Sequence, residues 1–322
     1  MLPIADGLTI CRSAPARERP EAARSTRAAE VRPGVTLAYV RAGIGGAPLL
    51  LVHGWPETKR IWWRNIEPLA AAGFEVIVPD LRGFGDSELA PDGFYDLAAH
   101  ARDCHALVHD VLGHATCVAA GGDLGGARRA GPRASAFPGS SRGSACSIRP
   151  LPPLRDAFVA AGLDPHVSAR VRQAADYYVR QGRDADALAA ELATPELRRR
   201  YVATFYGPRF WASPGRFTPA DVDFMTEPFA DAAKLRAGFA NYESALGTRP
   251  LSEPPRFLET NPVPTLVLYG PGRPRHLSAT SSRAPRSCSA SASGRSSVEG
   301  AGHFLQWERP DVLNQALRYF LR

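Results

Sequence analysis

The sequence contains no apolar run long enough to cross a bilayer. Its longest apolar runs, such as residues 48–53, have the length of a strand, whereas a membrane-spanning helix needs about 20 apolar residues. The first thirty residues are rich in Ala and Arg and lack the apolar stretch of a signal peptide. We therefore expect no membrane-spanning segment and no membrane partner. We interpret residues 1–32 as a disordered leader, since Glu18, Glu21 and Glu30 disfavour the alternative of a transit peptide.

Paired cysteines are also missing. The five cysteines are an odd number and show no paired spacing: Cys11, Cys104, Cys117, Cys146 and Cys288. This pattern indicates neither a disulfide framework nor a zinc site. A reducing compartment fits it best, and we predict a cytoplasmic protein.

Lysine is nearly absent, and arginine supplies the basic charge. Lys59 and Lys234 are the only lysines among the 39 lysines and arginines, and the net charge is +7. Two segments, residues 127–150 and 272–297, each contain five arginines and no acidic residue. Because these ten charges exceed the net charge of +7, the rest of the chain is slightly acidic. We therefore expect no nucleic-acid partner, although a charge of this sign would ordinarily suggest one.

Strand and helix patterns alternate through most of the chain. A continuous apolar run at residues 48–53 is typical of a buried parallel strand, and residues 61–72 have the spacing of an amphipathic helix. Further patterns predict strands at residues 35–39, 74–78, 116–120 and 264–269, and helices at residues 97–112 and 312–320. The alternation predicts an α/β fold with a doubly wound, mostly parallel sheet.

An aspartate occupies the point where one predicted strand runs into a glycine-rich turn. Residues 119–126 read Ala-Ala-Gly-Gly-Asp-Leu-Gly-Gly, with Asp123 at the bend. Small residues such as Gly121 and Gly125 suit a nucleophile elbow, because a larger neighbour would collide with the crossing backbone. A carboxylate is ionised at pH 7 and attacks carbon directly, which suits opening an epoxide or displacing a halide. The alternative is an ordinary turn in which Asp123 caps a helix.

Three motifs together resemble the epoxide hydrolase branch of the α/β-hydrolase superfamily. They are His53-Gly-Trp-Pro56, the loop of residues 79–87 and the Asp123 elbow. The resemblance covers residues 33–126, 151–271 and 298–322. It departs from the usual family pattern at the elbow, where Gly122 and Leu124 stand in place of His and Trp.

The resemblance implies a division of the chain and a set of site residues. Residues 33–150 and 261–322 would form the hydrolase core, and residues 151–260 an inserted helical cap. The backbone N–H groups of Trp55 and Leu124 would form an oxyanion hole, and His303, in the pattern Gly-Ala-Gly-His, would activate water. We expect His53 to hold its loop rather than to react.

Two cap tyrosines would donate to the epoxide oxygen as it leaves. Tyr178 and Tyr242 match the family positions best, and Tyr177 and Tyr206 remain alternatives. The implied reaction is cofactor-free hydrolysis of an epoxide to a vicinal diol by water. A dehalogenase with the same Asp and His is an alternative, although Leu124 offers no halide-binding side chain. No metal is implied, because His105 and His109, four residues apart, lack an indicated third ligand.

Two segments do not fit the family pattern. Residues 127–150 should supply a helix and a buried strand, and residues 272–297 should supply the acid that orients His303, yet both are rich in Ser, Arg, Ala and Gly. We expect no strand in either, and we interpret them as possible frameshift products, which resequencing of the gene would test. The missing acid predicts a weakly active or inactive chain, and it leaves a pseudoenzyme or binding protein as a further alternative.

Overall fold

The structure is a computed structural model that describes residues 25–123, 141–147, 176–207, 211–254, 265–270 and 292–321. Within these residues an eight-stranded sheet has the order β1-β2-β4-β3-β5-β6-β7-β8. The strands are β1 (Arg27–Arg32), β2 (Val35–Ala42), β3 (Ala47–Val52), β4 (Phe74–Pro79), β5 (Cys117–Gly122), β6 (Ser141–Ser147), β7 (Thr265–Tyr269) and β8 (Ala292–Ser297). β1 and β2 pair antiparallel, β2 pairs antiparallel with β4, and the remaining pairs are parallel.

The middle of the sheet is built from the apolar runs of the sequence. All six residues of β4 are buried, and so are the last four of β3. Strands covered on both faces need such continuous apolar sequences, whereas a half-exposed strand would alternate. The predicted α/β fold with a doubly wound, mostly parallel sheet is confirmed.

Helices pack against the sheet and close the core. α2 (Trp63–Ala70), which follows the turn η1 (Lys59–Trp62), packs against α15 (Pro310–Phe320), and the side chain of Asn65 donates to that of Asn314 at 2.8 Å. α14 (Leu305–Glu308) precedes α15. α3 (Leu97–Ala106) packs against β1 and continues into a π-helical turn, η2 (Leu107–Val111). Segments from both ends of the sequence therefore share one core.

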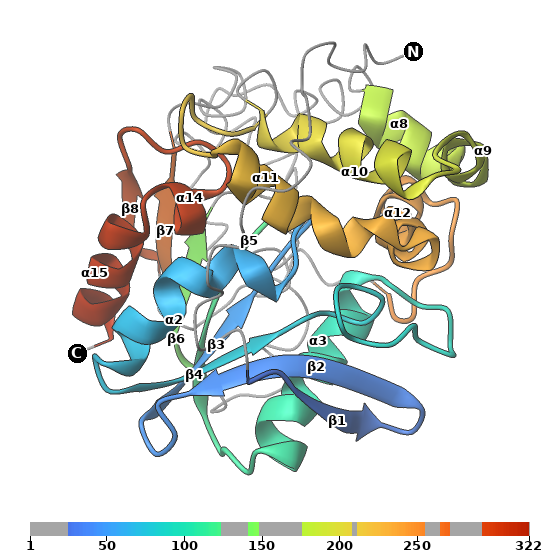
Figure 1. The fold of residues 1–322 in the computed structure, drawn as a ribbon. Helices are drawn as coiled ribbons and strands as arrows, with labels where there is room; N and C mark the ends of the chain where they lie inside the picture. Colours follow the sequence, from blue (N-terminus) through green and yellow to red (C-terminus); the bar gives the residue numbers. More distant parts are fainter. Residues whose placement is uncertain are drawn as a thin grey trace, which may run out of the picture.

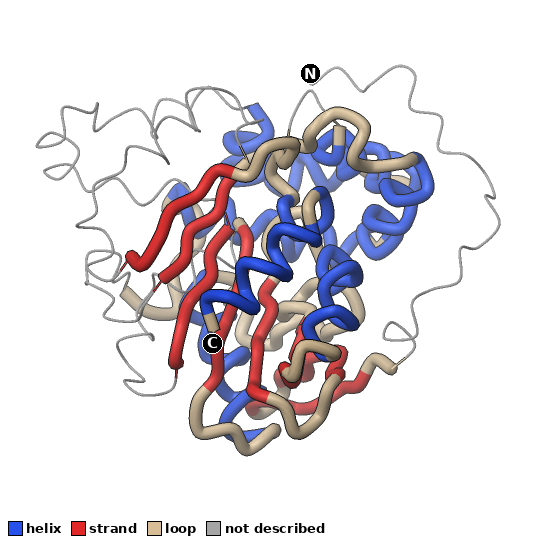
Figure 2. The backbone as a smooth tube through the Cα atoms, turned by 90° about the vertical axis from the view of Figure 1, so that its left-hand side faces the viewer, coloured by secondary structure: helices blue, strands red, loops and turns tan. Residues whose placement is uncertain are grey.

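The remaining helices gather beyond the carboxyl end of β5, above the sheet in Figure 1. They are α8 (Asp176–Arg183), α9 (Ala185–Glu191), α10 (Pro195–Ala203), η3 (Thr204–Tyr206), α11 (Pro219–Thr226), η4 (Glu227–Ala230) and α12 (Ala232–Leu246). Figure 2 shows the same grouping from the side, with the strands lying next to one another. These helices lie within the predicted cap of residues 151–260, and residues 151–175 lie outside the described part of the chain.

The longest of these helices, α12, carries its own start and stop signals. The side chain of Asp231 accepts hydrogen bonds from Ala233 N at 2.8 Å and Lys234 N at 3.2 Å, which satisfies two free amides of the first turn. Gly247 ends the helix with a left-handed φ of 76°, a conformation that costs glycine little. Both ends of α12 are therefore fixed by signals in the local sequence.

Two predictions about segment boundaries are wrong. Residues 27–32, which the sequence analysis assigns to the disordered leader, form β1 against β2. β6 and β8 lie within residues 127–150 and 272–297, where no strand is expected. Their sequences, SRGSACS and ASGRSS, have little strand propensity. The backbone groups at the edges of β5 and β7 need hydrogen-bond partners, and β6 and β8 supply them. Backbone pairing, rather than strand propensity, therefore decides the structure there.

No helix in the described ranges is both long and apolar enough to span a membrane.

Candidate active site

Asp123 stands directly beyond the last residue of β5. Its φ is 49°, and it is the one residue other than glycine with a positive φ among those described. Non-glycine residues adopt this conformation at a cost in energy, and such strain is typical of functional turns. The bend expected at Asp123 is therefore present, and its backbone is strained. Leu124, the second expected oxyanion donor, lies outside the described residues.

The loop that follows β3 meets the Asp123 side chain. The backbone N–H of Trp55 donates to Asp123 Oδ1 at 3.2 Å. The Trp55 ring is fully buried and lies edge-on to the rings of Phe84, Phe229 and Phe239. Because this packing holds the ring, it also holds the N–H that points at the carboxylate. Trp55 thus lies where the resemblance places one oxyanion donor.

His53 is buried in the same loop and makes two hydrogen bonds through its ring. Its Nε2 accepts from Leu81 N at 3.0 Å, and its Nδ1 lies 2.9 Å from the carbonyl oxygen of Gly54. Since Nε2 accepts, Nδ1 carries the proton and donates it to that carbonyl. The ring therefore ties the loop after β3 to the loop after β4, in agreement with the loop-holding role expected for His53.

His303 reaches the other oxygen of the Asp123 carboxylate. Its Nε2 lies 3.7 Å from Asp123 Oδ2, and the residue is 3 % exposed. The backbone N–H of His303 donates to the carbonyl oxygen of Trp211 at 2.7 Å, and the two rings lie 4.6 Å apart. The structure therefore brings Asp123, Trp55 and His303 together, although Asp123 and His303 are 180 residues apart in sequence.

Tyr178 and Tyr242 are also brought together. Their ring centroids lie 4.9 Å apart, and the Tyr242 ring lies 6.1 Å from that of Trp55. Burial raises the pKa of Tyr242 well above its usual value, and the neighbouring Tyr177 and the charge of Asp123 raise the pKa further. Tyr242 is thus a neutral phenol beside the carboxylate.

The two alternative tyrosines differ from each other. Tyr177 lies in the same group of rings, 6.1 Å from Tyr242. The buried hydroxyl of Tyr206 donates to the carbonyl oxygen of Pro56 at 2.5 Å, and its ring stacks on Phe304 at 4.6 Å. Because its hydroxyl is engaged with the loop before Glu57, Tyr206 is better suited to hold that loop than to donate to a substrate.

Two buried carboxyl groups beside the candidate site residues, those of Glu57 and Glu308, were not predicted from the sequence. Glu57 accepts from Gly54 N at 2.6 Å and from Gln306 Nε2 at 2.9 Å. Burial raises its pKa to about 8, against the lowering effect of the Gly54 N–H, and the charge of Asp123 raises it further. Glu308, which follows His303 by five residues, also has a raised pKa, about 7, because of burial. The sequence signal that could have pointed to both glutamates is an acidic residue directly after a largely apolar motif.

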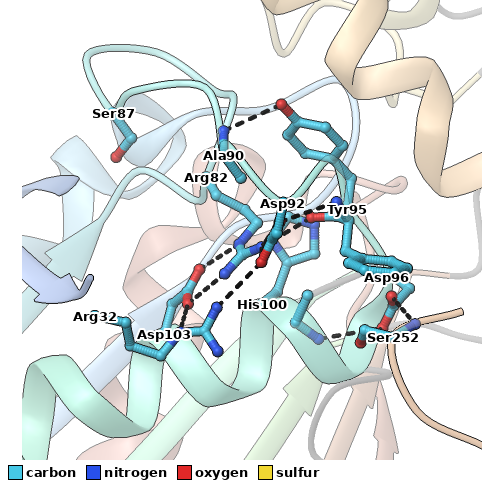
Figure 3. Close-up of polar contacts among 12 residues, drawn as sticks. Arg32, Arg82, Ser87, Ala90, Asp92, Tyr95, Asp96, His100, Asp103 and Ser252 are labelled. Atoms are coloured by element: carbon cyan, nitrogen blue, oxygen red, sulfur yellow. Dashed lines mark hydrogen bonds and ion pairs between the residues drawn. The ribbon is translucent and has the colours of Figure 1, made fainter. Parts of the chain in front are cut away.

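A buried ionic network supports the long loop between β4 and α3 (Figure 3). The fully buried guanidinium of Arg82 pairs with Asp103 on α3 and with Asp92, to which it donates at 2.8 and 2.9 Å. Nearby, the N–H and hydroxyl of Ser252 donate to the Asp96 carboxylate, at 2.7 and 2.9 Å. The loop is therefore fastened to α3 through Asp103, and the segment after α12 to the start of α3 through Asp96.

His105 on α3 and His109 on η2 lie apart from this site. The rings of His105 and His109 are 4.2 Å apart. Across the described ranges there is no group of three or more histidine, cysteine or acidic side chains that could bind a metal.

The chain is similar to known proteins in both sequence and fold. It matches the model of the alpha/beta hydrolase family over residues 49–316, and it belongs to that family. Among curated relatives it is 46 % identical to a soluble epoxide hydrolase of Corynebacterium sp. (strain C12), over 95 residues that make up 29 % of this chain and 31 % of the relative. It is 43 % identical to epoxide hydrolase A of Mycobacterium tuberculosis, over 25 % of this chain and 23 % of the relative. Each match thus spans less than a third of the relative.

Solved structures of low sequence identity share the fold over most of the chain. The epoxide hydrolase CorEH has a TM-score of 0.74 at 24 % identity, over 92 % of this chain and 99 % of that one. The juvenile hormone epoxide hydrolase of Bombyx mori has a TM-score of 0.70 at 20 % identity, over 95 % of this chain and 80 % of that one. The alpha/beta hydrolase family and the expected fold are therefore confirmed, and the proteins matched here are epoxide hydrolases.

Proposed function

We propose that the chain hydrolyses an epoxide to a vicinal diol through an ester on Asp123. The observation that carries the proposal is the position of the Asp123 carboxylate, with one oxygen 3.2 Å from the Trp55 N–H and the other 3.7 Å from His303 Nε2. The matched epoxide hydrolases support the same reaction. It requires no cofactor.

In the first step Asp123 is the nucleophile. Its oxygen forms a bond to a ring carbon of the epoxide, and the ring C–O bond breaks with its electron pair on oxygen. That oxygen takes a proton from the phenol of Tyr242, with Tyr178 as the second donor. Because the pKa of Tyr242 is raised by burial, the phenol holds its proton at neutral pH until the alkoxide forms.

In the second step His303 Nε2 takes a proton from water, and the hydroxide attacks Cγ of the ester. The charge that develops on the carbonyl oxygen faces the Trp55 N–H, with Leu124 N–H as the proposed second donor. The bond from Cγ to the alkyl oxygen breaks, and the imidazolium gives its proton to that oxygen. The other water proton, left on the Asp123 carboxyl, returns through solvent to the phenolate, which balances the reaction.

The two steps predict different phenotypes for two variants. Asp123→Ala should abolish turnover, whereas His303→Gln should allow the first step and accumulate the ester, because only the second step needs a base. Intact-protein mass spectrometry after incubation with a styrene-oxide-type substrate measures the adduct. His109→Gln, on the remote π-helical turn, is the control and should behave as the unmodified chain.

A third variant separates the proposed donor from the nucleophile. Tyr242→Phe should slow ester formation about 10- to 100-fold at little cost to packing, because it deletes one donor to the developing alkoxide. Full turnover by Asp123→Ala would contradict the proposal. Halide release from a haloalkane, without epoxide hydrolysis, would assign the same residues to a dehalogenase.

A further inference from the structure

The Glu308 side chain binds the backbone on both sides of His303. Its carboxylate accepts from the N–H of Gly302, through a short hydrogen bond to Oε2, and from the N–H of Phe304 at 3.3 Å through Oε1. The amide between these two, that of His303 itself, donates to the Trp211 carbonyl at 2.7 Å. All three successive N–H groups therefore have a buried acceptor, which fixes the direction of the His303 side chain.

The same carboxylate reaches across to the segment that lies on His303. Glu308 Oε2 also accepts from Ser213 N at 3.3 Å, and Ser213 follows Trp211, whose ring lies 4.6 Å from the imidazole. The His303 loop also packs closely against this segment, because a Cβ on Gly302 would lie 2.5 Å from the Trp211 oxygen and 2.6 Å from Ser213 N. One side chain thus joins the His303 loop and the ring that covers His303.

Charge adds a second effect. Burial raises the pKa of Glu308 to about 7, while the N–H groups of Gly302, Ser213 and Phe304 and the charge of Arg216 oppose the rise. Above that pH the carboxylate is a buried anion bonded to the backbone amides on either side of His303, the residue that must become a cation in the second step. A buried anion stabilises an adjacent imidazolium more than it would in water.

We propose that Glu308 is the positioning residue for His303 and stabilises its protonated form, in place of the acid that the sequence lacks after Tyr269. No acidic residue occurs between Glu259 and Glu299 in the sequence, and the Glu299 side chain is exposed. Glu308 exchanges no proton in the reaction and touches no reacting atom. The inference rests on the proposed function for its kinetic part alone.

Glu308→Gln tests the charge at nearly constant size. Because only the second step forms an imidazolium, ester breakdown should slow about 10- to 100-fold while ester formation changes less than about 3-fold. The acidic limb of the pH profile for breakdown should move lower, by up to about one unit, since the imidazole loses its proton more easily without the anion. Rapid-quench single-turnover measurements at several pH values, with a styrene-oxide-type substrate, give both rates.

Two further variants make the result specific. Glu308→Asp keeps the charge and should recover part of the breakdown rate. Glu299→Gln removes an exposed carboxylate four residues before His303 and should leave both rates unchanged. An equal fall in both steps of Glu308→Gln, accompanied by a lower melting temperature and an unmoved pH profile, would reduce Glu308 to a structural residue and overturn the proposal.

A readout that needs no turnover distinguishes this inference from the proposed function. Histidine NMR, with His303 assigned by comparison with His303→Gln, should show its titration lower in Glu308→Gln, by up to about one unit. An unmoved titration overturns the proposal even if the chain is active. A moved titration in a chain that forms no ester supports the role of Glu308 and refutes the proposed function.

Discussion

Replacing Glu57 by Gln should stabilise the protein at alkaline pH and leave it nearly unchanged at acidic pH. Glu57 is 1 % exposed, and burial raises its pKa from 4.5 to about 8 in the folded protein. The folded state therefore holds this proton more tightly than the unfolded state does. Its contribution to stability is fully present below pH 4.5 and is lost as the pH rises through 8.

The size of the effect follows from the shift. One pKa unit corresponds to about 1.4 kcal/mol, so the shift from 4.5 to about 8 corresponds to about 5 kcal/mol, of which about 4 kcal/mol is lost between pH 5 and pH 9. The amide that replaces the carboxyl group carries no charge at either pH. The Gln306 side-chain oxygen is buried and has no hydrogen-bond partner among the described residues, so a turn of the Gln306 amide lets that oxygen accept from the introduced amide.

Thermal unfolding of the two proteins from pH 5 to pH 9 measures the difference. At about 2 °C per kcal/mol, the melting temperature of Glu57→Gln should gain about 8 °C on the unmodified chain over this range. Glu67→Gln, an exposed site on α2, is the control and should show no such trend. Asp123→Asn should reduce the gain, because the Asp123 charge contributes to the shift. Parallel pH curves for Glu57→Gln and the unmodified chain would refute the reasoning.

Two further substitutions test how the core and α12 are held. Gly238→Ala would place a Cβ 2.1 Å from the Trp55 ring, so it should cost about 1–3 kcal/mol of stability and slow ester formation; normal values of both would show that the ring has room to move. Asp103→Asn leaves the buried Arg82 with Asp92 as its one acidic partner among the described residues and should cost about 3 kcal/mol in urea denaturation. The exposed pair Arg309–Asp311 provides the control, since Asp311→Asn should cost less than about 1 kcal/mol.

The features that could be predicted from the sequence are those written in neighbouring residues. The apolar runs of β3 and β4 determine buried strands, and the small residues around Asp123 determine the bend, where φ is 49°. Local sequence suffices there because strand burial and bend geometry depend on side chains that are adjacent in the chain. The position of His303 after the last strands was predicted from the family pattern in the same way.

The features that only the tertiary structure decided depend on distant partners. β6 and β8 are strands because β5 and β7 offer backbone groups for pairing, and nothing in their own sequences indicates it. The Tyr206 hydroxyl is engaged by Pro56, 150 residues away, which sets it apart from Tyr242. Glu308 matters because folding buries its carboxylate against Gly302, Phe304 and Ser213, and burial is a property of the packed chain rather than of any single stretch of sequence.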